Sequence, residues 1–271
     1  MIDLDFEYDG IYLSDFGYMV CSFDGTNDNT VSEGSEITLD LTPVANGTKH
    51  LLSAAKYDTC ISAEFDICKN PVCRNNQVDE ESFYISYDEE REISRWLNRK
   101  EMLPFKFISE HYEGIIFNGS FNISKIELGG KVVGFHLQFN SDRPFGYLDR
   151  KSKFKISAAN GKRIIYDDSD EIGSVPIDMI VELTGSGNLT ITNSFDNAEV
   201  VVKNCTSGEI ITFSNMQITS SDTNHMKTIM NDFNFSFPML SNSYSDRKNE
   251  FQFSLPCNVT IEYKSIRKVG I

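Results

Sequence analysis

The chain has 271 residues and a mass of 30.7 kDa, and 40% of its residues are hydrophobic, so we expect two domains with packed cores. Its formal charge of −15 is concentrated in residues 1–145, which hold 12 Lys and Arg against 25 Asp and Glu. An acidic half repels phosphate backbones, so the composition argues against sequence-specific binding of nucleic acid.

The first ten residues alternate between apolar and acidic side chains. The apolar set is Ile2, Leu4, Phe6 and Tyr8, and the acidic set is Asp3, Asp5, Glu7 and Asp9. This period of two predicts a half-buried strand with an anionic outer face, which Gly10 ends. Residues 11–23 are its continuation or its hairpin partner, and the polar residues 24–35 are expected to form an exposed loop or a flexible arm.

A strand is predicted over Ile61–Cys68, closed by Asn70-Pro71, and a helix is predicted to begin near Ser86. Ser86 and Glu89 fit a capping box, with acidic residues in the first turn and basic residues near the end of the helix. Apolar residues spaced i, i+3 and i+4 supply its buried stripe, namely Ile93, Trp96 and Leu97. Pro104 prevents a longer helix.

A hairpin is predicted next, with strands over residues 115–127 and 132–140 joined by Gly129-Gly130. In its second strand the apolar side chains point one way, while His136 and Gln138 point the other way. A lone histidine on the polar face of a strand is more often a solvated side chain than a catalyst. We place the domain boundary after this hairpin, between residues 141 and 147.

The second half is predicted to be a β-sandwich without a long helix. Strand-like runs recur with Gly, Asn and Ser turns between them, at residues 177–183, 188–192, 198–203, 209–213, 233–237, 251–255 and 259–263. The alternating aromatics Phe233, Phe235 and Phe237, and likewise Phe251 and Phe253, are interpreted as buried faces of strands.

A search for reactive centres predicts no catalytic, cofactor-binding or metal-binding residue. None of the usual hydrolase, nucleotide-binding or metalloprotease motifs is present, and the four histidines (His50, His111, His136 and His225) lie in no motif. Acidic pairs such as Asp167-Asp168 and the run 79–81 could serve a glycosidase, but they arise readily in so acidic a chain. The six cysteines are expected to be free thiols, since the spacing of Cys60, Cys68, Cys73 and His50 fits no usual zinc pattern.

No signal peptide or membrane-spanning run is recognised, so we expect assembly in the cytoplasm and no membrane insertion.

The order of the predicted structural elements in residues 96–147 is the most informative feature of the sequence. A helix with Trp96-Leu97 precedes the step Leu103-Pro104-Phe105, the Gly129-Gly130 hairpin follows, and the segment 143–147 (Arg-Pro-Phe-Gly-Tyr) ends the first domain. With the N-terminal strands that end near residues 15–17, this order resembles the distal tail protein (Dit) family of long-tailed, siphovirus-type phages. The resemblance covers about the first 150 residues.

The resemblance implies a mainly β fold with two domains. Residues 1–145 would be a β-sandwich or split-barrel-like domain with one α-helix that forms a hexameric ring, and residues 146–271 a galectin-like β-sandwich. The protein would then be a structural, non-enzymatic hub of the tail tip or baseplate, assembled in the bacterial host cytoplasm and carried in the virion. Its partners would be the tail tube protein, a tail-tip or tail-associated lysin protein, and receptor-binding proteins.

Two other functions stay open at the level of sequence. The galectin-like domain could be a carbohydrate-binding module for host adhesion, although Trp96 lies outside that domain, so stacking would fall to Tyr244 or Tyr263. A tail-associated hydrolase would need one of the acidic pairs.

Overall fold

The computed structural model describes residues 5–23, 37–38, 41–43, 49–51, 56–57, 60–71, 73–74, 77–78, 80–109 and 112–268. The predicted loop at 24–35, and with it Ile2 and Leu4, lies outside these residues. The chain divides into two compact units, one of residues 1–147 with 268–271 and one of residues 148–267, and each is described by itself. In the described part of the chain, no helix combines the length and apolar character that membrane crossing requires.

The first unit is built on a seven-stranded antiparallel sheet with the order β2-β1-β11-β12-β13-β8-β3. The strands are β1 (Phe6–Tyr8), β2 (Ile11–Tyr12), β3 (Tyr18–Cys21), β8 (Ser62–Lys69), β11 (Leu103–Phe107), β12 (Phe117–Leu128) and β13 (Lys131–Ser141). The helical elements are η1 (Leu13–Phe16), η2 (Glu80–Phe83) and α1 (Tyr87–Leu97). Three small ladders pair β4 (Ile37–Thr38) with β7 (Lys56–Tyr57), β5 (Leu41–Pro43) with β6 (Lys49–Leu51), and β9 (Cys73–Arg74) with β10 (Gln77–Val78).

The predicted N-terminal strand is confirmed in its described part, because Phe6 and Tyr8 are buried while Glu7 lies on the opposite face. The prediction for residues 11–23 is correct only at its start, where β2 pairs with β1. The chain then forms η1, and Gly17 leaves this helix in the left-handed conformation with φ of 75°. This turn carries β3 to the other edge of the sheet, where it pairs with β8.

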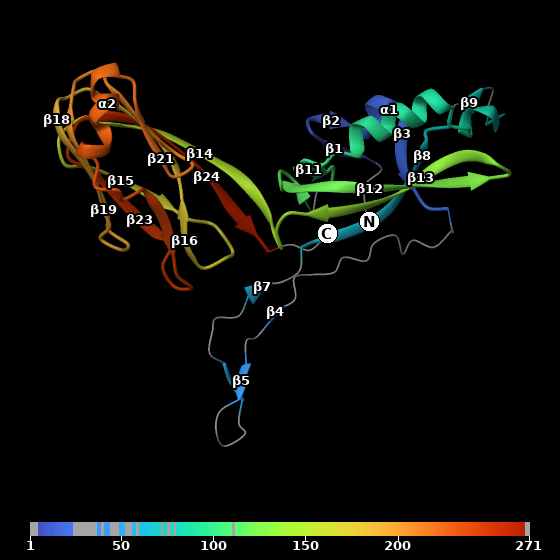
Figure 1. Ribbon diagram of the computed structural model, residues 1–271, viewed down its shortest axis with the longest axis horizontal. Coiled ribbons are helices and arrows are strands. Elements are labelled where there is room, and N and C mark those ends of the chain that lie inside the picture. Colours follow the sequence, from blue (N-terminus) through green and yellow to red (C-terminus); the bar gives the residue numbers. More distant parts are fainter. Residues whose placement is uncertain are drawn as a thin grey trace. The chain divides into compact units, whose positions relative to one another are not determined.

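Helix α1 begins as predicted. Ser86 caps it, and Glu89 returns the bond, since its carboxylate accepts from the Ser86 backbone N–H at 2.8 Å. The predicted stripe is buried and faces the sheet, and Figure 1 shows α1 lying along one side of β12 and β13. The Trp96 indole donates to the backbone oxygen of Tyr8 at 3.1 Å and stacks on the Phe6 ring at 5.8 Å. The helix is therefore fixed to the sheet by an apolar stripe and one directional bond.

The predicted hairpin is confirmed as β12 and β13, joined by Gly129 and Gly130 with φ of 60° and 79°. Positive φ at both positions is what a two-residue turn of this hand requires, and glycine adopts it without strain. Strand β11 was not predicted, because Pro104 was interpreted only as the residue that stops the helix. Pro104 has no backbone N–H to donate, but its carbonyl oxygen accepts from the Asp9 N–H at 2.9 Å, so it can take part in this strand.

The second unit is a β-sandwich. One sheet has the order β14-β24-β17-β20-β21, the other has the order β15-β23-β18-β19, and β16 pairs with β22. The strands are β14 (Gly146–Ile156), β15 (Gly161–Tyr166), β16 (Gly173–Pro176), β17 (Asp178–Leu183), β18 (Gly187–Asn193), β19 (Glu199–Cys205), β20 (Ile210–Ser214), β21 (Gln217–Ser220), β22 (Met239–Asn242), β23 (Lys248–Phe253) and β24 (Cys257–Arg267). Alternating side chains of both sheets form one core.

Six of the seven strands predicted for this half correspond to strands of the sandwich, and Phe251 and Phe253 are buried as expected. The interpretation of residues 233–237 was wrong. Phe233 is buried, but Phe235 has φ of 59° and is 63% exposed, so the three rings do not share the face of a strand. The ten-residue helix α2 (Thr223–Asp232), which packs against β19 and β21, was not predicted either.

Candidate assembly surface

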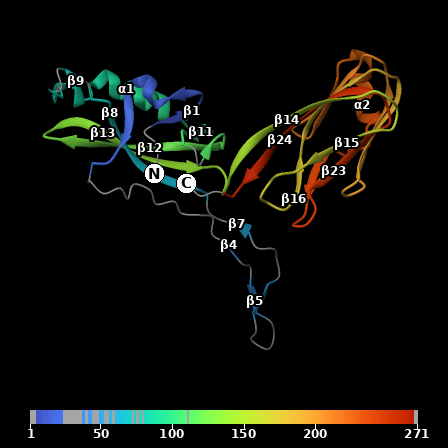
Figure 2. The same ribbon diagram turned by 180° about the vertical axis from the view of Figure 1, so that it is seen from behind.

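The sheet of the first unit has two chemically different faces. One face is aromatic and lies against α1, and both views place α1 on the same side of β12 and β13 (Figures 1 and 2). The other face, called here the polar face, carries the alternate side chains of the same strands, including Glu7, Lys106, Gln138 and Glu64. Within the described part of the unit, this face offers hydrogen-bonding groups and charges to a partner.

A hydrogen-bonded row crosses three strands of the polar face. The register aligns Asn122 of β12, Gln138 of β13 and Glu64 of β8. Asn122 donates to the Gln138 oxygen at 3.1 Å, and Gln138 donates to Glu64 at 2.9 Å. Each side chain of the row is thus held in one orientation before any partner arrives.

The charges of the polar face are largely paired. Lys106 contacts the Glu7 carboxylate at 2.9 Å, directly across from it in the register. His136 lies as predicted on this face, with Nδ1 at 2.8 Å from an Asp66 oxygen and Nε2 at 3.8 Å from a Glu64 oxygen. The ring is 42% exposed, so it is a half-solvated partner of two carboxylates. These pairs went unpredicted, although Phe105-Lys106-Phe107 is the basic counterpart of Phe6-Glu7-Tyr8 and could have revealed the first of them.

Two exposed apolar side chains lie near the start of α1 and the turn of the β12–β13 hairpin. Tyr87 is 72% exposed and Leu128 is 70% exposed. They belong to the same end of the unit, because Lys125 pairs with Glu90 on α1 and Lys131 lies 4.0 Å from the centre of the Tyr84 ring. We call Tyr87 and Leu128 the tip patch. Contiguous exposed apolar surface often marks a contact with another protein, whereas single exposed apolar side chains are ordinary.

The two sheet edges are short. Strand β2 has two residues and β3 has four, and no described strand pairs with their outer sides. Unpaired strand edges provide directional hydrogen bonds for another chain, but strands this short provide only a few. An assembly joined here would need the polar face or the tip patch as well.

In the second unit, the acidic pair Asp167-Asp168 connects different strands through ion pairs and hydrogen bonds. Asp168 contacts Arg150 and accepts from Arg267 at 2.6 Å. Burial raises the pKa of Asp168, but these bonds lower it more, to about 2. Asp167 is buried and accepts from Asn242 at 2.5 Å. Both carboxylates are engaged by groups of the same unit, so contacts within the fold account for the pair.

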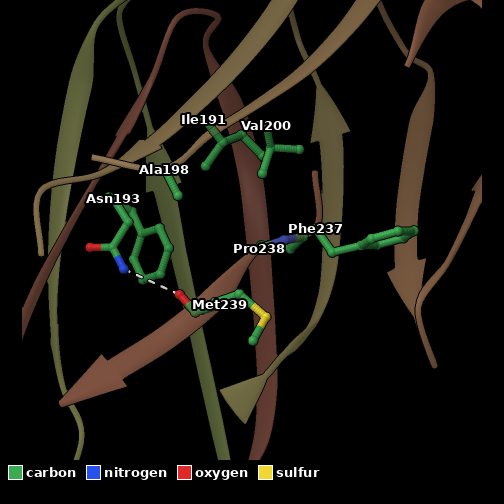
Figure 3. Close-up of a pocket in the computed structure, with 8 residues that line it drawn as sticks. Ile191, Asn193, Ala198, Val200, Phe237, Pro238 and Met239 are labelled. Atoms are coloured by element: carbon green, nitrogen blue, oxygen red, sulfur yellow. Dashed lines mark hydrogen bonds between the residues drawn. The ribbon is translucent and has the colours of Figure 1, made fainter. Parts of the chain in front are cut away.

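A hollow in the second unit is lined mainly by apolar side chains, including Ile191, Val200 and Met239 (Figure 3). Its empty volume of about 210 Å³ includes space open to solvent, so the enclosed part is smaller still. The Asn193 amide, the polar group at its rim, donates to the Met239 carbonyl at 3.2 Å. The hollow is therefore lined by apolar side chains and by an amide that is already engaged within the unit.

The residues weighed for sugar binding or metal binding are dispersed. Trp96 is buried in the first unit, while Tyr244 is 89% exposed and Tyr263 is half-buried in the second. Cys60 is exposed and Cys68 is half-buried. His111 and Asp79 lie outside the described residues, and the side chains of His50, Cys73, Glu80 and Glu81 are likewise not described.

Comparisons with known proteins cover nearly the whole chain. Residues 1–143 match a family model described as a phage tail protein N-terminal domain, and residues 145–263 match one described as a phage tail C-terminal domain. The crystal structure of the SPP1 Dit (gp 19.1) protein is similar, with a TM-score of 0.64 and 12% sequence identity over 96% of this chain and 98% of that one. That protein is described as a paradigm of the hub adsorption apparatus in phages that infect Gram-positive bacteria. The sequence has no match among curated proteins.

Proposed function

Because the chain belongs to the phage tail protein family whose N-terminal and C-terminal domains it contains, we propose that it is the distal tail protein of a long-tailed phage. The observation that carries this proposal is the likeness of fold to the SPP1 Dit protein over almost the full length of both chains. The protein is a phage tail component, and its role at the tail tip would be structural and non-enzymatic.

In this role, six copies of the first unit would close into a ring. A contact between two different surfaces of one subunit generates a ring when the rotation it imposes closes. The first unit has such different surfaces, because its polar face and its tip patch differ in chemistry. One side of the ring would bind the tail tube protein and the other side the tail-tip or tail-associated lysin protein, while the second units would carry receptor-binding proteins.

The tip patch supports burial in such a contact. Fully burying an exposed Leu side chain contributes about 1.5 to 3 kcal/mol, before the entropic cost of association is subtracted. A ring repeats the same contact at every subunit, so a modest loss of binding free energy at each contact would weaken the whole ring. We therefore expect polar substitutions at Tyr87 and Leu128 to break the oligomer without unfolding the unit.

The experiment measures the mass of the purified full chain by light scattering and images it by negative stain. We expect a particle of six times the 30.7 kDa chain mass and six-fold annuli. The double variant Tyr87→Ser with Leu128→Ser should give a smaller mass by light scattering and no annuli in negative stain. Tyr244→Ser is the matched control, because Tyr244 is even more exposed, at 89%, but lies in the second unit. A monomer at high concentration, unchanged by addition of the tail tube protein, would refute the ring.

A further inference from the structure

The chain crosses between the two units twice. It leaves the first unit after Tyr147 and returns to it at Lys268. Inside the second unit the outgoing segment becomes β14 and the returning segment is β24, and these two strands are neighbours in one sheet (Figures 1 and 2). Two crossings that are held together restrict the motion of the second unit more than a single linker does.

Within the second unit, one carboxylate holds the two crossing strands together. Arg150 of β14 and Arg267 of β24 both bind Asp168, the second at a distance of 2.6 Å. Arg267 also lies 3.7 Å from an Asp170 oxygen. Because Arg267 is the last residue of β24 and of the second unit, the returning chain is fixed up to the point where it crosses.

Within the first unit, two aromatic rings hold the Lys268 ammonium. Lys268 Nζ lies 5.3 Å from the centre of the Tyr57 ring and 5.4 Å from the centre of the Phe145 ring. The two rings meet edge to face, with their centres 4.8 Å apart. Nζ also donates to the Tyr57 hydroxyl oxygen at 3.0 Å. An ammonium within about 6 Å of a ring centre is attracted by the negative face of the ring, so these contacts bind the charge of Lys268.

The three residues come from three segments that are distant in the sequence. Tyr57 belongs to β7, Phe145 lies just before the chain leaves the first unit, and Lys268 is where the chain returns. The contact of Lys268 with Phe145 therefore joins the outgoing and the returning chain, and Tyr57 attaches both to β7. The core of the first unit does not depend on this contact, because Lys268 is exposed and lies outside every strand.

We propose that Lys268, Tyr57 and Phe145 form a reversible latch that controls how freely the second unit turns on the first. When the latch is closed, the two crossings are held together in both units and bend as one two-stranded hinge. When it opens, the returning chain is released and the outgoing crossing carries the second unit. The contacts of an exposed ammonium with aromatic rings are individually weak, so the latch opens and closes readily. In a tail protein it would set the reach of the second unit, but it lies within one chain and does not depend on a ring.

The test compares small-angle X-ray scattering of the full-length variants, with in-line light scattering so that species of equal mass are compared. Lys268→Met keeps the length of the side chain and removes its charge, so we expect a broader distribution of intramolecular distances than in the wild type. Lys268→Arg keeps a cation over the rings and should give the wild-type profile. Lys153→Met is the matched control, because Lys153 is an exposed lysine of the other crossing strand, β14.

A second measurement reports on the latch in the wild-type protein. A limiting amount of an acetylating reagent modifies each lysine at a rate that mass spectrometry follows. Lys268 should react at least about fivefold more slowly than Lys153, because its nitrogen donates to Tyr57 and lies against two rings. Phe145→Leu should remove most of this protection.

If Lys268 and Lys153 are acetylated at the same rate, or if the scattering profile of Lys268→Met superimposes on that of the wild type, the proposal is wrong and Lys268 is an ordinary surface lysine. Trp96 fluorescence and circular dichroism show whether both units of each variant are folded. Should Lys268→Met not fold, the acetylation rates of the wild type still decide the question. Failure of the latch leaves the proposed ring untouched, because the ring is tested by particle mass.

Discussion

Phe6 is the centre of the aromatic core that fixes α1 to the first sheet, and its truncation tests whether the two units fold separately. The side chain is completely buried, and its ring centre lies between 5.4 and 5.8 Å from those of Phe65, Trp96, Phe105 and Phe121. Replacing a buried Phe by Ala costs about 3 to 5 kcal/mol. With a urea dependence of about 2 kcal/mol per molar, the midpoint of unfolding should fall by about 2 M.

The fluorescence of Trp96 is the assay, because it is the only tryptophan in the chain and reports the first unit alone. Phe6→Ala should move this transition. The control Phe253→Ala, which truncates a buried ring of the second unit, should leave it in place while lowering a second transition seen by circular dichroism. A Trp96 midpoint that responds equally to both substitutions would show one cooperative fold and refute the predicted domains 1–145 and 146–271.

Two further substitutions test single positions. The pKa of Asp168 is lowered to about 2 from 3.8, so its bonds to Arg150 and Arg267 stabilise the second unit above pH 4 and are lost as the pH falls from 4 toward 2. The melting temperature of Asp168→Asn should therefore be lower at pH 6 and less dependent on pH between 4 and 2, and a parallel pH profile would contradict this. Gly119→Ala would place a Cβ 2.4 Å from the Asn140 carbonyl oxygen and the Phe139 ring, so it should destabilise the first unit by about 1 to 3 kcal/mol in urea. The control Gly208→Ala lies in the second unit, so a similar shift in the Trp96 transition would count against the steric explanation.

Where local signals were unambiguous, the sequence predicted the structure well. The capping box of Ser86, the Gly129-Gly130 turn and the alternation in residues 61–68 each depend on contacts between near neighbours in the chain. These features placed α1, the hairpin and β8 within a residue or two. The class of fold, mainly β in both halves, followed from the same alternation.

The predictions that failed have a common cause. At these positions the structure depends on contacts between residues that are distant in the sequence. Alternation of Phe233, Phe235 and Phe237 predicts a strand, but Phe235 adopts positive φ and is exposed. Helix α2 was missed because its apolar positions are few, and its attachment to the sheets depends on buried polar residues such as His225 and Glu209. The bond between Glu209 and His225 joins residues on either side of β20 and β21, and no motif spacing marks it.

The row of Asn122, Gln138 and Glu64 has a direction, since each amide gives its hydrogen toward the carboxylate at one end. Reversing the charge at Glu64 would therefore do more than alter one position. A lysine there would confront the Gln138 NH₂ group with another donor, and both amides would have to flip in sequence. Surveys of this face by charge reversal would then perturb three strands at once, whereas Glu64→Gln removes the charge and keeps an acceptor at the end of the row.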